Sequence, residues 1–191
     1  MDRLTIVKVG GKVVEEPELL DRLLDAFTTI TGYKILVHGG GKAATDLAAR
    51  LGVETKMVDG RRITDLETLE IVTMVYGGLI NKRVVAGLQA RNCNALGLTG
   101  TDLDLVRARK RAVTDIDYGY AGDVENVNSR ELRIILGENV IPVVAPLTHD
   151  GKGMMLNTNA DTIASRLAIE LSHFYKVLLF YCFEKRGVLS D

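Results

Sequence analysis

Two strand-to-glycine transitions near the start of the chain most constrain what it can fold into. An apolar, strand-like run leads directly into glycines at IVKVGGKVV, residues 6–14, and again at ILVHGGGKAATD, residues 35–46. Glycine has no Cβ, so its backbone N–H can approach an oxyanion closely. A helix that begins just after the glycines adds the positive end of its dipole. One such transition fits a simple tight turn, but two predict a site built from backbone amides.

The spacing of these glycines excludes two familiar nucleotide-binding loops. HGGGKAATD lacks the G-x-x-x-x-G-K-[ST] spacing of the P-loop. No G-x-G-x-x-G follows a predicted strand, as a Rossmann dinucleotide site requires. A site at these glycines must therefore bind its ligand in another way.

Lys8 lies inside the first apolar run, two residues before Gly10 and Gly11. Strand alternation places its side chain on the opposite face from Val7 and Val9. There the ammonium group either reaches solvent beside an edge strand or lies beside phosphate oxygens. Phosphoryl transfer depends mainly on positioning and charge stabilisation. We predict that Lys8 acts on a transferring phosphoryl group.

Apolar strand patterns alternate with helical patterns along the whole chain. Strands are predicted at residues 4–9, 33–38, 94–98, 140–147 and 176–183, and helices from Pro17, at 42–52, from 64 to about 92, at 129–139 and at 159–172. Residues 99–128 are more polar and predict short strands and a hairpin. Strand–helix alternation with short links indicates an α/β fold with a mainly parallel sheet.

Two helix starts have recognisable capping patterns. TDLE at residues 64–67 reads as a capping box, in which Thr64 and Glu67 satisfy amides at the start of the long helix. Ser129 is the predicted N-cap of the helix at 129–139. The long helix is expected to be disturbed at Gly77 and Gly78.

Composition excludes several classes of partner. The formal net charge of the 191 residues is -1, so no basic excess is present to bind nucleic acid or a membrane surface. The two cysteines, Cys93 and Cys182, have no metal-ligand neighbours at close spacing, which predicts neither a disulfide framework nor a metal site. This cysteine usage and the absence of a signal-peptide pattern at Met1 predict a reducing, cytoplasmic location.

Polar side chains gather in two further motifs. DGRRIT, residues 59–64, places Arg61 and Arg62 just before the long helix, where they either face solvent or bind a carboxylate through two parallel bonds. MLNTNADT, residues 155–162, carries Asn157, Asn159 and Asp161 on a strand-to-helix turn. These groups either cap the helix or face the same site as Lys8.

His38 stands at the end of the second predicted strand, directly before Gly39. A histidine at a strand end can act in a site or pack in the core. We interpret His38 as structural rather than catalytic.

These motifs together resemble the amino acid kinase family. KVGGK near the N-terminus, VHGGGK, GRRIT before a long helix and LNTNADT occur in the family's order along essentially the whole chain. Their separations look most like the members that phosphorylate an N-acylated glutamate in arginine biosynthesis. The resemblance implies a three-layer αβα sandwich and transfer of phosphate from MgATP to the side-chain carboxylate, with N-acetyl as the usual acyl group and a larger one left open.

The resemblance also implies roles for individual residues. Lys8 would stabilise the transferring phosphoryl group, and Asp161 would hold the catalytic lysines in place. The remaining matched positions divide into phosphate-binding and substrate-binding groups: the phosphate would be bound by Gly10 and Gly11, and the acylated amino acid by Gly40, Gly41, Arg62 and Asn157. ATP would carry the Mg²⁺, and no protein-bound metal is expected.

The resemblance divides the chain into two parts. Residues 1–175 would bind the acyl-amino acid and form a homodimer, and residues 176–191 would begin an ATP-binding part that is largely missing. The family's second lysine lies far downstream of NADT and has no match here, so we expect the natural chain to continue past Asp191. The long helix is the expected dimer contact because it carries a surplus of apolar positions: Leu66, Leu69, Val72, Met74, Val75, Tyr76, Leu79 and Ile80.

Two alternatives remain beside a kinase of N-acylglutamate. The first is another relative within the family, acting on carbamate, aspartate, free glutamate or a nucleotide. The second is a non-catalytic binding module.

Overall fold

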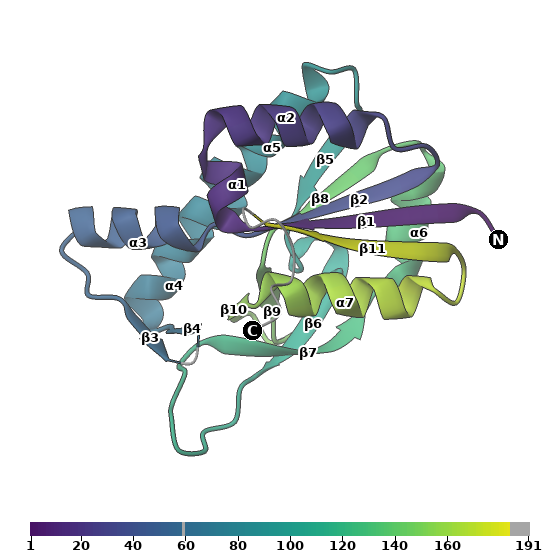
Figure 1. The fold of residues 1–191 in the computed structure, drawn as a ribbon. Helices are drawn as coiled ribbons and strands as arrows, with labels where there is room; N and C mark the ends of the chain where they lie inside the picture. The colour runs from purple at the N-terminus through teal and green to yellow at the C-terminus, as the bar shows by residue number, and fades with distance from the viewer. Residues whose placement is uncertain (59, 184–191) are drawn as a thin grey trace, which may run out of the picture.

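A computed structural model describes residues 1–58 and 60–183 of the chain (Figure 1). The helices are α1 (Gly11–Glu15), α2 (Pro17–Thr28), α3 (Gly41–Arg50), α4 (Leu66–Val72), a π-helical segment (Thr73–Ile80), α5 (Asn81–Gln89), a short 3₁₀ turn (Asp102–Asp104), α6 (Ser129–Gly137) and α7 (Ala160–Leu171). The strands are β1 (Arg3–Val9), β2 (Tyr33–His38), β3 (Lys56–Val58), β4 (Arg61–Ile63), β5 (Ala95–Leu98), β6 (Val106–Lys110), β7 (Ala121–Val127), β8 (Ile141–Val144), β9 (Leu147–His149), β10 (Met155–Thr158) and β11 (Lys176–Cys182).

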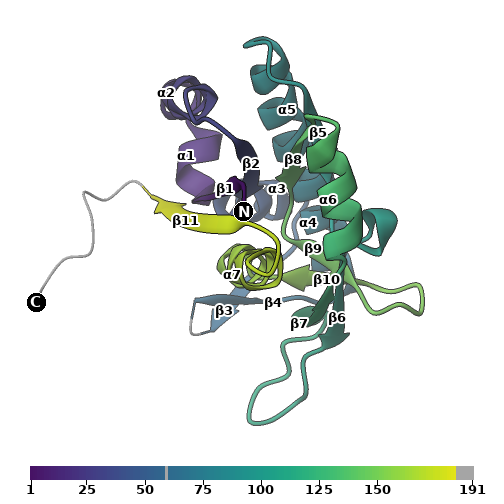
Figure 2. The same ribbon diagram turned by 90° about the vertical axis from the view of Figure 1, so that its right-hand side faces the viewer.

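The main sheet is parallel throughout, in the order β11-β1-β2-β8-β5. Helices cover both of its faces: Figure 2 shows α1 and α2 on one side of β1 and α7 on the other. The two faces bury separate apolar clusters. Val7, Val9 and Leu36 face the side of α2 and α5, whereas Leu4 and Ile6 face α6 and α7. The predicted α/β class and three-layer αβα sandwich are confirmed.

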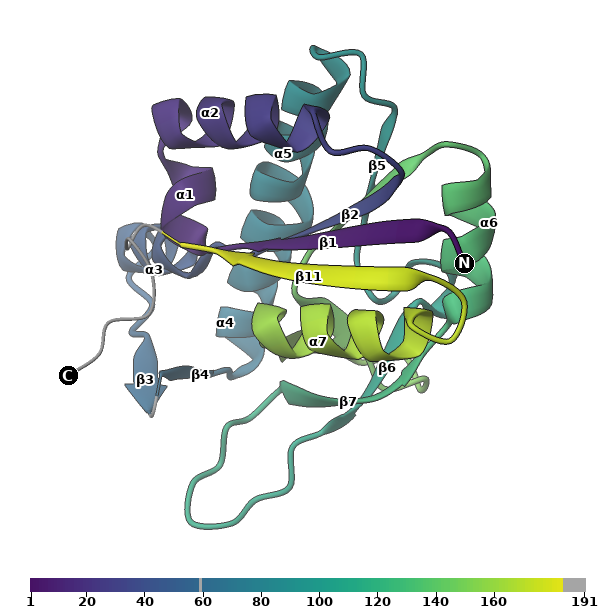
Figure 3. The same ribbon diagram turned by 45° about the vertical axis from the view of Figure 1, so that its right-hand side comes forward.

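A second, smaller sheet closes on itself as a barrel of β10, β7, β6 and β9. Strands β6 and β7 form the antiparallel hairpin predicted within residues 99–128. The connection between them reaches towards β3 and β4 (Figure 3), where Thr64 pairs with Gly119. The predicted strand at 140–147 is in fact two strands, because β8 belongs to the main sheet and β9 to the barrel.

Residues Leu66–Gln89 form one long helical segment with a π-helical stretch at Thr73–Ile80. The predicted disturbance at Gly77 and Gly78 is therefore confirmed, and such stretches recur at functional sites. By length and apolar composition alone, the segment could also cross a membrane. Buried core helices meet the same criterion, and Val72 and Val84 are fully buried against the main sheet.

Both predicted capping residues are wrong by one position. The N-cap of α4 is Asp65, whose side chain accepts a hydrogen bond from the Thr68 amide at 2.8 Å. Thr64 is engaged elsewhere: its hydroxyl donates to the Arg62 carbonyl at 3.2 Å, and its backbone pairs with the β6–β7 connection, accepting from Tyr120 and donating to Tyr118. At α6 the cap is Asn128, not Ser129.

The sequence did not predict several short elements, among them α1, β3 and β4. Helix α1 has only five residues and the two strands three each, too few for a periodic pattern to show. Strand β11 covers the start of the predicted ATP-binding part, and residues 184–191 lie outside the described structure. The proposed division at residues 175 and 176 stays a prediction.

Candidate functional site

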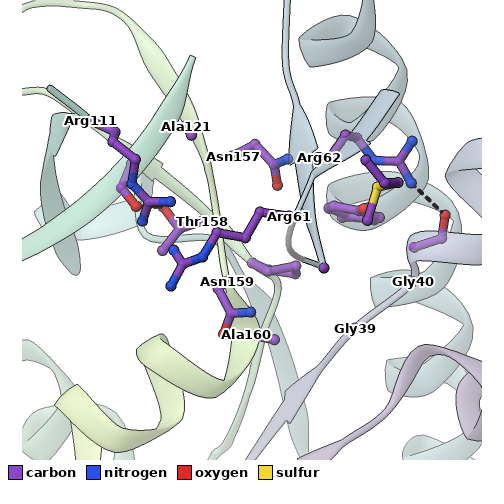
Figure 4. A pocket seen from close by; sticks show the side chains of 16 residues that line it. Gly39, Gly40, Arg61, Arg62, Arg111, Ala121, Asn157, Thr158, Asn159 and Ala160 are labelled. Carbon is purple, nitrogen blue, oxygen red and sulfur yellow. Dashed lines mark hydrogen bonds between the residues drawn. The ribbon is translucent and has the colours of Figure 1, made fainter. Parts of the chain in front are cut away.

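A cavity of about 200 Å³ lies at the ends of β2 and β10 and at the starts of β4 and β7 (Figure 4). Ligand sites in parallel α/β sheets characteristically form at the carboxyl ends of the strands. Sixteen residues line the cavity: Gly39, Gly40, Gly41, Met57, Gly60, Arg61, Arg62, Tyr76, Arg111, Ala121, Gly122, Pro146, Asn157, Thr158, Asn159 and Ala160. All four predicted substrate-binding residues, Gly40, Gly41, Arg62 and Asn157, are among them.

The two glycine clusters meet directly. A Cβ built on Gly11 would lie 3.0 Å from the Gly40 nitrogen and 3.1 Å from the Gly41 nitrogen. A Cβ on Gly39 would likewise lie 3.0 Å from the Gly11 nitrogen. Backbone atoms cannot move aside as a flexible side chain can, so any larger residue at Gly11 would force the loops apart. The two strand-to-glycine transitions are therefore parts of one structure.

The backbone amides of these glycines differ in availability. The Gly10 amide donates to the Cys182 carbonyl at 2.9 Å, and the Gly39 amide donates to the Val9 carbonyl at 2.9 Å. Within residues 1–58 and 60–183, no acceptor is recorded for the amides of Gly11, Gly40 and Gly41. A phosphate-binding role for Gly10 stays a prediction, and in this structure its amide serves the sheet.

Lys8 and Asp161 form an ion pair between β1 and the first turn of α7. The Lys8 Nζ lies 2.8 Å from Asp161 Oδ1. Lys8 faces α7, as strand alternation predicts, and its side chain is only 15% exposed against 50% for Asp161. The contact implied by the family resemblance is present, although neither residue lines the cavity itself. Their roles in chemistry stay predictions.

Arg62 is buried at the cavity wall with one side of its guanidinium group occupied. Its Nη2 donates to the Gly41 carbonyl at 2.8 Å and to Thr45 Oγ1 at 2.9 Å. Figure 4 shows the first of these bonds. Its Nη1 is buried and has no partner within the described residues. An unpaired buried donor costs about 1–3 kcal/mol, and this nitrogen is shielded from the cavity as well as unpaired.

Asn157 lies in β10 and Asn159 lies two residues later at the start of α7, and their side chains have different tasks. The Asn157 side chain donates to Thr64 Oγ1 at 3.0 Å, which orients its amide at the cavity wall. Asn159 caps α7 by accepting from the Thr162 amide at 3.0 Å. The capping interpretation is thus confirmed for Asn159, while Asn157 faces the site.

His38 is fully buried, and burial lowers its pKa to about 4. Its two ring nitrogens face the Gly39 carbonyl at 2.9 Å and the Asn81 amide nitrogen at 3.2 Å. A neutral ring that donates from Nδ1 and accepts at Nε2 satisfies both contacts. The structure agrees with the structural interpretation of His38.

Arg111 and Tyr76 also line the cavity, although the sequence predicted neither as a site residue. Arg111 follows β6 and is held by a bidentate pair with Asp123 of β7, whose pKa this contact lowers. Tyr76 lies on the π-helical segment, and burial raises the pKa of its hydroxyl. No local pattern marks either residue, because a hairpin brings one to the site and the packing of a long helix the other.

The charged residues that line the cavity all carry a positive charge. Three arginines, Arg61, Arg62 and Arg111, line it, and none of the sixteen described lining residues is acidic. A cationic cavity beside free glycine amides suits a carboxylate or phosphate ligand.

A parallel αβα sandwich with a cationic cavity at its strand ends, next to a lysine–aspartate pair, fits the class of small-molecule phosphotransferases. Residues 3–185 match the amino acid kinase family. The chain belongs to that family.

Known relatives share most of the sequence. The chain is 62% identical over 190 residues to an acetylglutamate kinase of Phocaeicola vulgatus, covering 100% of this chain and 74% of the relative. It is 44% identical over 192 residues to an acetylglutamate kinase of Methanopyrus kandleri, covering 98% of this chain and 74% of that one.

Solved structures share the fold. The structure of smu.665 from Streptococcus mutans has a TM-score of 0.75 at 28% identity, over 88% of this chain and 69% of that one. An N-acetylglutamate synthase of Neisseria gonorrhoeae complexed with coenzyme A and N-acetyl-glutamate has a TM-score of 0.79 at 22% identity, over 97% of this chain and 42% of that one. At that identity the second likeness concerns the fold alone.

Proposed function

We propose that the chain phosphorylates the side-chain carboxylate of an N-acylated glutamate with ATP, converting N-acetyl-L-glutamate to N-acetyl-L-glutamyl 5-phosphate in arginine biosynthesis. The observation that carries the proposal is 62% identity along the whole chain to a relative named acetylglutamate kinase. The cationic cavity beside the joined glycine loops supports it, because both the acceptor and the donor of this reaction are anions.

The cavity provides contacts for the acceptor. Arg62 would bind a carboxylate at the cavity wall, and the amides of Gly40 and Gly41 would add further donors. Asn157, held by Thr64, would contact the polar groups of the acylated amino acid. Together these groups would hold the reacting carboxylate still, which lowers the entropic part of the barrier.

Lys8 would act on the phosphoryl group in transit. A carboxylate oxygen of the acceptor attacks the γ-phosphorus, the bond to the β-phosphate oxygen breaks, and ADP leaves; no proton needs to be removed from an ionised carboxylate. The Lys8 ammonium, held by Asp161, would balance negative charge on the transferring oxygens. Mg²⁺ carried by ATP would neutralise the remaining phosphates. We place the reaction in the cytoplasm.

A coupled assay that follows ADP release tests the proposal on the complete natural polypeptide. The acceptors are N-acetyl-L-glutamate, a glutamate with a larger acyl group, L-glutamate, L-aspartate and carbamate. We expect turnover with one or both N-acylated glutamates and little with the others. Preference for a free amino acid or for carbamate would assign the chain to another branch of the family, and no turnover with any acceptor would favour a binding module.

The long helical segment supports the further proposal that the protein is a homodimer. Of its eight apolar positions singled out in the sequence, five are buried in the core, but Leu66, Met74 and Leu79 are each more than half exposed. Exposed apolar side chains that gather on one element mark contact surfaces, and two-fold dimers are the commonest assemblies.

Leu79→Glu is expected to convert the dimer largely to monomer at micromolar concentration, because the substitution places a charge in an apolar contact. Light scattering of the purified protein measures the assembly. Ile134→Glu on α6 is the matched control, since Ile134 is similarly exposed and lies on another helix. A wild-type monomer, or a Leu79→Glu dimer as stable as the wild type, would remove this surface from the assembly.

A further inference from the structure

We propose that Thr45 is a positioning residue, whose hydroxyl orients the Arg62 guanidinium group for the carboxylate of the substrate. Thr45 lies on α3, one turn after Gly41, and does not line the cavity itself. The inference rests on the proposed function, because it takes Arg62 as a group that binds N-acylglutamate.

The Thr45 hydroxyl makes two hydrogen bonds, and these determine where its proton points. Its Oγ1 lies 3.0 Å from the Gly41 carbonyl oxygen and 2.9 Å from Arg62 Nη2. Arginine can only donate, so the hydroxyl must accept from Nη2 and give its single proton to the Gly41 carbonyl. Nη2 also donates to that carbonyl at 2.8 Å, which closes a three-membered ring of hydrogen bonds.

This ring determines where the rest of the guanidinium group points. The group is planar, so two contacts on Nη2 limit both its tilt and the position of Nη1. Nη1 is buried and without a partner within residues 1–58 and 60–183, and Arg62 lines the cavity. The guanidinium group at the cavity wall is therefore already ordered, and binding of an anion there loses less entropy.

A simpler interpretation is that Thr45 only bonds back to its own helix, as threonines often do. Thr73 shows that pattern alone: its hydroxyl donates to the Leu69 carbonyl, four residues back, at 2.8 Å, and no arginine of the described residues bonds to it. Thr45 makes the same backward bond but adds a contact to Arg62, which lies 17 residues away on β4. The bond between Thr45 and Arg62 connects α3 to the proposed substrate-binding arginine.

The test compares Thr45→Val, which keeps the shape but loses the hydroxyl, with Thr45→Ser, which keeps the hydroxyl. In steady-state assays of the complete natural polypeptide, Thr45→Val should raise KM for N-acetyl-L-glutamate about tenfold, the scale of one lost bond to a charged group. KM for ATP should stay near the wild-type value, the protein should remain folded, and Thr45→Ser should recover most of the affinity. Thr73→Val is the matched control and should leave both KM values unchanged.

A double mutant separates positioning from general packing. In an Arg62→Lys background, Thr45→Val should raise KM much less than it does alone, because the group that it orients is gone. Unchanged KM in Thr45→Val, an equal rise for both substrates, failure of Thr45→Ser to recover, or additive effects in the double mutant would overturn the inference. A wild-type protein that phosphorylates no N-acylglutamate would instead overturn the proposed function, and the role of Thr45 with it.

Discussion

Replacing Lys8 with alanine is expected to lower kcat roughly a hundredfold or more, because one charge contact to a transferring phosphoryl group is worth a few kcal/mol. KM for the acylated amino acid should change little, since Lys8 does not line the cavity in which Arg62 and Asn157 lie. The fold should survive. Asp161, the partner of Lys8, is half exposed, so losing the pair costs little stability.

Steady-state kinetics and thermal unfolding of the complete natural polypeptide measure both effects. Lys42→Ala is the matched control, because Lys42 also lies next to a glycine cluster and also pairs with an aspartate, Asp46, but is largely exposed and lies outside the cavity. A Lys8→Ala enzyme with near-normal kcat would remove Lys8 from the chemistry. A variant that fails to fold would show instead that its pair with Asp161 is structural.

Replacing Arg62 with lysine is expected to raise KM for N-acetyl-L-glutamate by one to two orders of magnitude, about 1.4 kcal/mol for each factor of ten. Lysine keeps the positive charge but loses the planar fork. Lysine has a single side-chain nitrogen. It therefore cannot bond to the Gly41 carbonyl and the Thr45 hydroxyl with one nitrogen and contact the substrate with another. KM for ATP should change far less.

Arg91→Lys is the control for this exchange. Arg91 is also partly buried and donates to two carboxylates, Asp21 and Asp25, but it lies between α2 and the end of α5, outside the cavity. Its replacement should leave both KM values unchanged. An Arg62→Lys effect confined to ATP would place Arg62 on the nucleotide and not on the acyl-amino acid.

The cavity also shows why Gly11 and Gly40 should resist substitution for different reasons. A Cβ on Gly11 would meet backbone nitrogen atoms of the neighbouring loop, which cannot rotate away. A Cβ on Gly40 would meet side chains of the π-helical segment, with a ring carbon of Tyr76 at 3.0 Å. The long helical segment and the glycine loops are thus packed against one another, which links the proposed dimer element to the binding site.

The sequence by itself determined the features that depend on one element at a time. Alternation within β1 placed Lys8 on the face away from Val7 and Val9, because successive side chains of a strand point in opposite directions. Strand and helix periodicities predicted the α/β class. The glycines at both strand ends predicted an amide-lined site, because only glycine permits backbone to approach so closely.

The tertiary structure alone decided which donors stay free and which are already paired. Thr64 follows a capping pattern, yet it pairs with Gly119 and receives a bond from Asn157, 93 residues away. Gly10 and Gly11 look alike in sequence, but only the Gly10 amide is taken by Cys182. A hydrogen bond between distant segments depends on sheet order and register, which no local pattern encodes. For the same reason the sequence could not predict Arg111 as a cavity residue, because the β6–β7 hairpin brings it to the cavity wall.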